Sequence, residues 1–424
     1  MTDRGKNKSV AVVLGGTSPH VRLIEKLKER GFYVCLIDYL KNPPGAAVAD
    51  EHIQESTLDL EAVERIAREK KAGLVISTCI DQANSTCCYV AEKLDLPHPY
   101  SYQTSLDVTD KARMKRIFVE NQIPTSWFQI MREDVEEDAC ADVPFPAVVK
   151  PVDCNSSKGV HRVDGPEEAY HYLKQAIQLS RTKAAIIEGF NAGAEIQVDC
   201  LATEDDADVI MTRQKQKASG ENTMVLQSFG SIVPAPLTPE LTAQARDIAR
   251  KIAKAFQLKN TPFFYQAIVT NEGIQVLEFA PRIGGGLSYY LIKLVTGFDP
   301  IEAAIKSFLG EPVDDVKKPK DRCYSTNLLY MHPGTFDHIE GLEQLKADSL
   351  IQNWFVMKNK GDVIDDDMRS GNRVGAFVIE ADSYQDLFRR AEIAYSRIEI
   401  KDNHGNKMLN RDMWRNRIDE TPSV

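Results

Sequence analysis

The sequence lacks the features that mark several large classes of protein. None of its apolar runs approaches the roughly 18 residues of a membrane span, and no secretory signal precedes the first apolar segment. Its eight cysteines and eight histidines are scattered, without a CxxC pair or a Cys/His ladder of zinc-binding spacing. A formal net charge of −10 argues against a general nucleic-acid surface but still allows a locally basic pocket. We therefore expect a cytoplasmic protein with reduced cysteines, bound neither to a membrane nor to nucleic acid.

The composition is that of a globular chain with room for more than one core. Hydrophobic residues make up 43% and charged residues 27% of the 424 positions, which is enough for several domains. Strand and helix patterns alternate over residues 9–100, with strands expected at 9–14, 32–39 and 74–78 and helices at 19–30, 58–71 and 82–94. This alternation predicts βαβ units and a parallel sheet. The turn at residues 15–18, Gly-Gly-Thr-Ser, would lie at the carboxyl end of that sheet, either against a substrate or as a tight turn only.

The pattern changes beyond residue 100. A helix is expected at 110–120, followed by strand-rich sequence from 145 to 279. That stretch is interrupted by a helix at 239–257, which begins with Thr238 as N-cap and Pro239 at the first helical position. A third region follows Pro312, with strands near 324–331 and 375–380 and an amphipathic helix capped by Ser383.

The most informative stretch, residues 265–286, reads as a β-hairpin that leads into a glycine loop. A three-residue loop at Asn271–Gly273 would make Thr270 pair with Ile274, and counting back then places Gln266 opposite Glu278. Cross-strand neighbours on one face have Cβ atoms about 4.5–5.5 Å apart, close enough to share a hard cation through oxygen ligands. Arg282 follows shortly after the strand, and its planar fork suits phosphate or carboxylate. These residues form a candidate site for a magnesium nucleotide.

Two lysines and a turn of small residues are candidates for phosphate binding. Lys150 ends an apolar strand, and the turn after it contains Ser156, Ser157 and Gly159, whose backbone N–H groups can form an anion-holding concavity. The alternative is a polar hairpin turn beside a solvated lysine. Lys111 is a further cation on the expected helix at 110–120, with Lys115 one turn later, although solvated helical lysines are the more common case.

Two acids bracket a glycine-bearing connection. Glu188 ends one apolar strand and Glu195 begins the next. Either carboxylate can accept hydrogen bonds from ribose hydroxyls, and the backbone between them can read an adenine edge. The alternative is a pair of exposed acids at strand termini. The segment 212–217, with Arg213, Lys215 and Lys217, would supply further cations near a carboxylate substrate unless it is a solvated strand.

Taken in this order, the lysines, the small-residue turn, the paired acids and the hairpin strongly resemble the ATP-grasp superfamily of carboxylate–amine ligases. The amino-acid ligase, biotin-carboxylase-like, purine-carboxylase and carbamoyl-phosphate-synthetase-like branches are the most similar. The resemblance implies an α/β and α+β multidomain fold. Its parts would be an N-terminal parallel α/β domain (1–105), an ATP-grasp domain of a small lobe (106–190) and a large lobe (191–311), and a small C-terminal α+β domain (312–424) packing on the large lobe.

The resemblance also implies how ATP would be held. Lys111 and Lys150 would bind its phosphates, and the loop with Ser156, Ser157 and Gly159 would cover them. It further implies that Glu188 and the backbone of Phe190 contact the adenine of ATP and that Glu195 binds the ribose.

The metal and catalytic positions follow the family pattern with two departures. Glu278 and Gln266 would bind Mg²⁺, or Mn²⁺ in its place. Lys150 and Arg282 would be catalytic: Lys150 would stabilise the transferred phosphoryl group, and Arg282 that group or the substrate carboxylate. Many members have Glu where this chain has Gln266, and the usual Asn two residues after the second acid is Ala280 here. An amide oxygen still binds Mg²⁺, but Ala280 cannot, so one metal would be held more weakly or completed by water.

The function implied is an ADP-forming ligase that joins a small-molecule carboxylate, such as an amino acid, to an amine through an acyl phosphate. One alternative is an ATP-driven carboxylase or phosphotransferase acting on bicarbonate or another small oxyanion. The other is a non-catalytic nucleotide-binding regulator, to which Gln266 and Ala280 point. A homodimer stays open because many relatives dimerise. A Rossmann oxidoreductase is disfavoured because the sequence has no GxGxxG with a downstream ribose acid.

Overall fold

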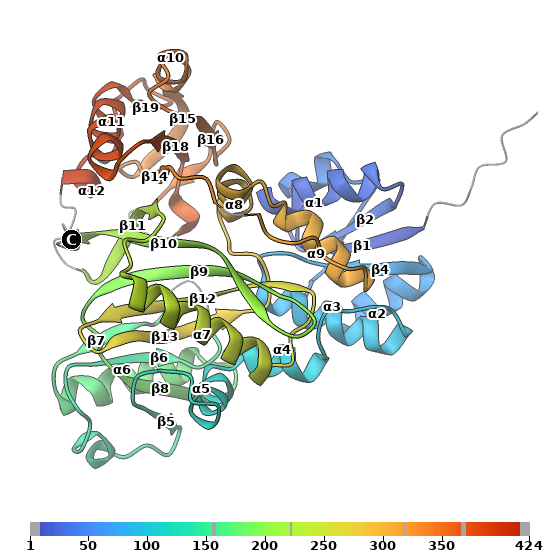
Figure 1. Ribbon diagram of the computed structural model, residues 1–424, viewed down its shortest axis with the longest axis vertical. Coiled ribbons are helices and arrows are strands. Elements are labelled where there is room, and N and C mark those ends of the chain that lie inside the picture. Colours follow the sequence, from blue (N-terminus) through green and yellow to red (C-terminus); the bar gives the residue numbers. More distant parts are fainter. Residues whose placement is uncertain (1–8, 155–157, 221–222, 318, 366–369, 416–424) are drawn as a thin grey trace, which may run out of the picture.

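The computed structural model describes residues 9–154, 158–220, 223–317, 319–365 and 370–415. Its first part is a four-stranded parallel sheet in the order β3-β2-β1-β4, as the alternating pattern predicted (Figure 1). The strands are β1 (Val10–Leu14), β2 (Tyr33–Asp38), β3 (Glu51–Gln54) and β4 (Ala72–Ile76), and the helices are α1 (Ser18–Glu29), α2 (Leu60–Glu69) and α3 (Asp81–Leu94). Sequence analysis missed β3, because this short edge strand has no fully buried residue to give it an apolar signal.

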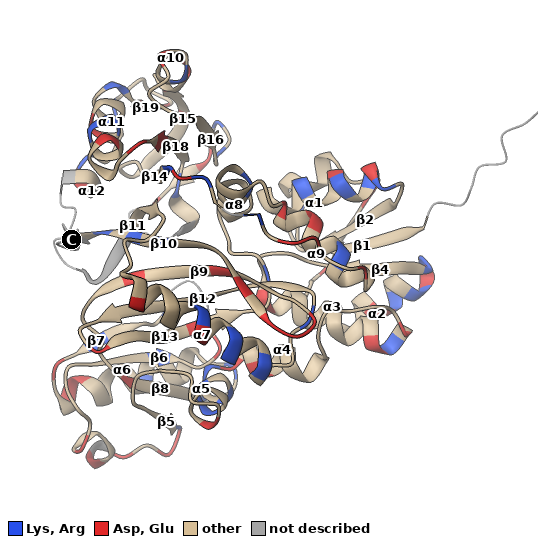
Figure 2. Cartoon of the chain, viewed as in Figure 1, with Lys and Arg blue, Asp and Glu red and all other residues tan. Residues whose placement is uncertain are grey.

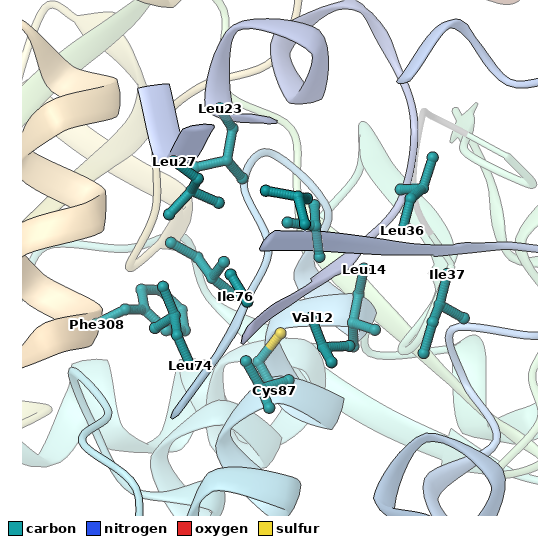
Figure 3. Packing of buried hydrophobic residues seen from close by; sticks show 14 of the residues in the cluster. Val12, Leu14, Leu23, Leu27, Leu36, Ile37, Leu74, Ile76, Cys87 and Phe308 are labelled. Atoms are coloured by element: carbon teal, nitrogen blue, oxygen red, sulfur yellow. The ribbon is translucent and has the colours of Figure 1, made fainter. Parts of the chain in front are cut away.

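The core of this sheet is shared with a later segment of the chain. Strands β1, β2 and β4 are apolar along most of their length because helices cover both faces of a parallel sheet. Phe308, from helix α9 (Pro300–Leu309), packs into the same cluster as Leu74 and Ile76 (Figure 3). Outside this core, Arg30, the C-cap residue of α1, pairs with Glu302 and Glu311 at 2.5 and 3.0 Å. The N-terminal sheet is therefore docked on the large lobe by apolar and ionic contacts together.

Two helices lead into a second sheet, which also has four strands. These are α4 (Tyr102–Thr109) and α5 (Lys111–Glu120), and the latter is capped by the Asp110 carboxylate. The sheet is antiparallel, in the order β5-β8-β6-β7, and helix α6 packs on it. Its elements are β5 (Phe128–Arg132), β6 (Ala147–Pro151), β7 (His161–Val163), α6 (Pro166–Leu179) and β8 (Ala184–Gly189).

A single eight-stranded sheet, in the order β13-β12-β9-β10-β11-β14-β18-β16, joins the large lobe to the C-terminal region. Its strands are β9 (Ala194–Ala202), β10 (Ala207–Gly220), β11 (Thr223–Val233), β12 (Thr261–Thr270), β13 (Gly273–Ala280), β14 (Cys323–Leu329), β16 (Asn353–Val356) and β18 (Gly375–Ala381). The two parts of this sheet are joined where β11 pairs with β14 in antiparallel fashion. The C-terminal region therefore continues the sheet of the large lobe by backbone hydrogen bonds.

Helices and a fourth sheet, of three strands in the order β17-β15-β19, complete the fold. Helix α7 (Pro239–Ala255) packs on the large-lobe end of the big sheet, and α8 (Ser288–Thr296) follows the glycine loop. The remaining elements belong to the C-terminal region: β15 (Gly334–Glu340), α10 (Leu342–Ala347), β17 (Val363–Ile364), α11 (Tyr384–Arg397), β19 (Glu399–Asp402) and α12 (Asp412–Arg415). The expected N-caps are confirmed, since the Thr238 and Ser383 hydroxyls accept hydrogen bonds from Leu241 N and Asp386 N.

The register of the β12–β13 hairpin corrects one expectation and confirms another. Thr270 pairs with Gly273 across a two-residue loop, so the expected three-residue loop and the Thr270–Ile274 pair are wrong. A β-bulge between Gln266 and Ala267 then shifts the pairing by one residue. Gln266 therefore lies opposite Glu278, as the sequence predicted.

Charged side chains of both signs are interspersed over the molecule. Blue and red segments alternate along α1 and α2 in Figure 2, in keeping with ion pairs such as Arg68–Glu64. Among the described residues, no helix is long and apolar enough to cross a membrane.

Replacing the cap of α7 tests the local basis of this fold. Thr238→Ala removes the acceptor for Leu241 N, and we expect the free energy of unfolding to fall by about 1 kcal/mol in denaturant titration. Thr238→Ser keeps the hydroxyl and serves as the control. Equal stability of the alanine and serine variants would show that the cap does not stabilise the helix.

Candidate active site

A carboxylate buried between two lysines lies at the centre of the small lobe. Glu188, on β8, is 2% exposed, and its Oε1 lies 2.7 Å from Nζ of Lys150 on the neighbouring strand β6. Its Oε2 lies 3.1 Å from Nζ of Lys115, a fully buried residue of α5. Lys115 Nζ also donates to Thr125 Oγ1 at 2.5 Å and to the carbonyl of Val276, on β13, at 3.4 Å. The three charges therefore connect the small-lobe sheet to the hairpin of the large lobe.

Burial and pairing act in opposite directions on these groups. Burial alone would raise the pKa of Glu188, but Lys115 and Lys150 hold it down at about 2. Burial lowers the pKa of Lys115, and the attraction of Glu188, with a weaker one from Glu278, only partly offsets this. Glu188 is therefore an anion over the whole physiological range.

A second cluster of charges lies on the large sheet. Glu195 of β9 pairs with Lys215 and with Lys217, both on β10, the latter at 2.6 Å. Burial would raise the pKa of Glu195, but the two lysines hold it at about 2. Lys215 also donates to Oε1 of Gln266 at 3.1 Å. The alternatives of exposed acids at strand termini and of a solvated 212–217 strand are thus wrong.

Glu278 differs from the other acids of the region. Within the part of the chain that the structure describes, it makes no hydrogen bond and no ion pair, although it lies opposite Gln266 and is half-buried. Its charge nevertheless acts on two cations, since it contributes to the raised pKa of Arg282 and opposes the lowering of the pKa of Lys115 by burial. Among the described residues, Glu278 is therefore a carboxylate without a direct partner, and it acts electrostatically on cations of two different segments.

The oxygen donors present fit a magnesium ion shared with phosphate. The described residues contain no group of three or more His, Cys, Asp or Glu that could form an all-protein cage. Mg²⁺, however, is commonly bound through one or two carboxylates, with phosphate and water oxygens completing the shell. Glu278 supplies such a carboxylate, and the amide oxygen of Gln266 opposite it is a second, weaker donor that Lys215 already engages.

Arg282 is held by a residue that sequence analysis did not select. Its Nε and Nη2 donate to Oδ1 and Oδ2 of Asp81, both at 2.6 Å, across 201 positions of sequence. The guanidinium also lies 5.1 Å from the centre of the Phe264 ring. Asp81 is the first residue of α3, at the carboxyl end of the parallel sheet, where ligands of such sheets tend to lie. That position is the signal that could have identified it.

The remaining predicted positions are less closely connected. Lys111 donates from Nζ to the carbonyl of Cys154 at 2.8 Å, at the start of the small-residue turn. Phe190 is 37% exposed, and its ring lies 4.6 Å from the guanidinium of Arg162. Gly159 has a φ of +72°, which suits a glycine turn, whereas Ser156 and Ser157 lie outside the described residues.

The geometry thus brings together most of the residues selected from sequence. Lys150 and Glu188 are in direct contact, Glu195 and Gln266 share Lys215, and Glu278 lies opposite Gln266. Lys115 was not selected from the sequence, because the helical pattern around a lysine does not predict an ion pair with a buried acid on a distant strand.

Two protein families match this chain. Residues 109–286 match the family described as the ATP-grasp (A) domain of phosphoribosylglycinamide synthetase. Residues 327–402 match the L-amino acid ligase C-terminal domain 2. The first match begins just before Lys111 and ends at the last glycine of the loop after Arg282, so it spans both lobes that carry the charged clusters.

Individual relatives agree with these matches. The multifunctional protein pyrABCN of Emericella nidulans is 25% identical over 319 residues, 71% of this chain and 13% of that protein. The C-terminal section of the carbamoyl phosphate synthase large chain of Aquifex aeolicus is 24% identical over 70% of this chain. This chain spans 57% of the length of the Aquifex protein. The crystal structure of L-amino acid ligase from Bacillus licheniformis superimposes with a TM-score of 0.77 at 20% identity, covering 94% of this chain and 100% of that one, which shows a shared fold.

Residues 109–286 are therefore an ATP-grasp domain, and residues 327–402 belong to the family of the L-amino acid ligase C-terminal domain 2. This chain combines the two.

The lowered pKa of Glu188 predicts how the free energy of unfolding changes at acid pH. Its folded-state pKa of about 2 lies below the ordinary value of 4.5, so its contribution to the free energy of unfolding is present above pH 4.5 and is lost as the pH falls toward 2. Glu188→Gln leaves Lys115 without its buried anion and should cost about 3–5 kcal/mol at neutral pH. Denaturant titrations at several pH values should then show a shallower decline for the variant. A wild-type slope in the variant would contradict this assignment, and Glu272→Gln, at the exposed hairpin turn, is the control.

Proposed function

We propose that this protein is an ATP-dependent, ADP-forming carboxylate–amine ligase that acts on an amino acid or a related small carboxylate. Support comes from the match to an ATP-grasp domain and to an L-amino acid ligase C-terminal domain. The single observation that carries the proposal is the position of Glu278. It is a carboxylate with no protein partner among the described residues, opposite Gln266 on the β12–β13 hairpin, and its charge acts on both Lys115 and Arg282.

The chemistry requires activation of a poor acyl donor. A carboxylate oxygen attacks the γ-phosphorus of ATP, the bond from that phosphorus to the β,γ-bridging oxygen breaks, and ADP leaves. The amine nitrogen then attacks the carbonyl carbon of the acyl phosphate, and phosphate leaves with the bridging oxygen. The amine loses a proton as the new C–N bond forms. No covalent enzyme nucleophile is needed, so the protein acts by alignment and by stabilising charge.

Each charged residue has a place in this scheme. Lys150 and Lys111 bind phosphate oxygens, and Arg282 binds the substrate carboxylate or the transferred phosphoryl group. Glu195 holds the ribose, and the backbone around Phe190 contacts adenine next to Glu188. Glu278 and Gln266 would hold Mg²⁺, which supplies charge neutralisation to the phosphates when bound. Lys150 already lies 2.7 Å from Glu188, so phosphate binding would share this lysine between two anions.

We further propose the division of the chain into residues 1–105, 106–190, 191–311 and 312–424, action in the cytoplasm, and small molecules as the only partners that the reaction needs. The deciding experiment is a screen for ADP and phosphate release over amino acids, singly and in pairs, with and without bicarbonate. Dependence on a pair, with a coupled product in mass spectrometry, supports ligation. Release that needs bicarbonate and no amine would replace the ligase by a carboxylase, and no release under any condition would favour a regulator.

Removal of the Glu278 carboxylate tests the metal assignment. We expect Glu278→Ala to lower ADP formation by at least about a thousandfold while leaving the unfolding midpoint nearly unchanged, because this carboxylate has no hydrogen bond or ion pair to lose among the described residues. The matched control is Glu272→Ala, at the solvent-exposed loop of the same hairpin. Undiminished turnover in Glu278→Ala would rule out the metal role.

Removal of the Lys150 charge tests the phosphate assignment. Lys150→Met keeps the length of the side chain but removes one cation, so the KM for ATP should rise by about tenfold or more in steady-state assays. Lys115 still pairs with Glu188 in this variant and limits the effect on stability. An unchanged KM for ATP would move the phosphate site elsewhere, and Lys174→Met, at an exposed position of α6, is the control for the loss of a lysine.

A further inference from the structure

The contact between Arg282 and Asp81 joins two parts of the chain that have separate sheets. Arg282 follows β13 in the large lobe, whereas Asp81 begins α3 in the N-terminal sheet. Both side chains are largely buried, with 14% and 19% of their surfaces exposed. Burial opposes the charge of Arg282, but Asp81 raises the pKa of the guanidinium above its ordinary value. The pair is therefore a charged, bidentate clamp across a domain boundary.

The number of donors in this clamp is informative. A guanidinium has five N–H groups. Asp81 takes one from Nε and one from Nη2, and the carbonyl of Ile283 takes one from Nη1 at 2.9 Å. One N–H on each terminal nitrogen remains, so the guanidinium keeps a second pair of donors while the first pair fixes its plane. Phe264 lies against the face of the group and restricts its tilt further.

Two simpler explanations account for less. An acid at the first position of a helix stabilises that helix, but this needs no partner from a segment 201 residues away. A structural clasp between domains is already provided by Arg30 with Glu302 and Glu311, and by Phe308 in the shared core. Neither explanation accounts for a bidentate contact with Arg282, the arginine between strand β13 and the glycine loop.

We propose that Asp81 is a positioning residue for Arg282 in the ligation step. Its carboxylate fixes the guanidinium so that the two unused N–H groups face the oxygens of the carboxylate or phosphoryl group as charge develops on them. Asp81 itself contacts neither substrate. This inference rests on the proposed function and adds that the N-terminal sheet supplies part of the catalytic geometry.

The experiment compares Asp81→Asn, Asp81→Ala and Asp81→Glu with Arg282→Ala and the double variant Asp81→Ala/Arg282→Ala. Asparagine offers one acceptor oxygen where two are needed, so Asp81→Asn should lower kcat by about a hundredfold. The KM for ATP should stay within about twofold, because on the proposed function Arg282 acts on the transferred phosphoryl group or the substrate carboxylate and not on the adenosine part of ATP. Asp81→Glu restores a carboxylate and should recover part of kcat. The double variant should be no slower than Arg282→Ala alone, since Asp81 acts only through that arginine.

The control is Arg30→Gln, which breaks ion pairs between the same two parts of the chain at a distance from the site. It should keep the wild-type kcat and lose a similar amount in unfolding midpoint. The proposal is overturned if the Asp81 variants keep kcat as Arg30→Gln does, or if the double variant loses the product of the single losses. Wild-type protein that releases no ADP with any carboxylate instead contradicts the proposed function, and this inference falls with it.

Discussion

The arrangement of the site depends on one buried carboxylate that must not be left without cations. Removing an ion from water costs several kcal/mol unless an opposite charge and hydrogen bonds replace the water. Glu188 meets this requirement by drawing Lys150 from the adjacent strand and Lys115 from α5 into direct contact. Because Lys115 also reaches Thr125 and the carbonyl of Val276, the same requirement fixes the small-lobe sheet against the β13 strand that carries Glu278. A local electrostatic constraint thereby sets the relation between the two lobes.

The charges along this path alternate in sign. Glu188 pairs with Lys115, Lys115 and Arg282 both feel Glu278, and Arg282 pairs with Asp81. Each end of the series lies in a different part of the chain, and only Glu278, in its middle, has no direct partner among the described residues. A polyanionic substrate with a divalent cation would therefore enter a region in which acidic and basic side chains already alternate.

Sequence was a good guide wherever a local pattern decides the structure. The period of apolar residues predicted the parallel sheet, and the hydroxyls of Thr238 and Ser383 marked two helix starts. The pairing of Gln266 with Glu278 was also predicted, although the loop was one residue shorter than expected and a bulge corrected the register. Neither the loop nor the bulge has a distinctive residue pattern here, because Gly273 suits both loop lengths.

Contacts between distant segments were beyond the reach of such patterns. Lys115 and Asp81 read as an ordinary helical lysine and a helix-starting acid, and only the fold shows that each meets a charged group far away in sequence. The order and spacing of the motifs nevertheless indicated the superfamily, because those motifs record the same fold. The spacing could not predict which lysine or arginine forms an ion pair with which acid.

The continuous sheet has a consequence for how this protein can be dissected. Strand β14 is hydrogen-bonded to β11 on one side and to β18 on the other, so a cut near residue 312 would leave β11 as a bare edge. Unpaired N–H and C=O groups along such an edge recruit strands from other chains. The region after residue 312 therefore cannot be exchanged as an independently folding domain. Chimeras between relatives should be joined through loops that leave this sheet intact.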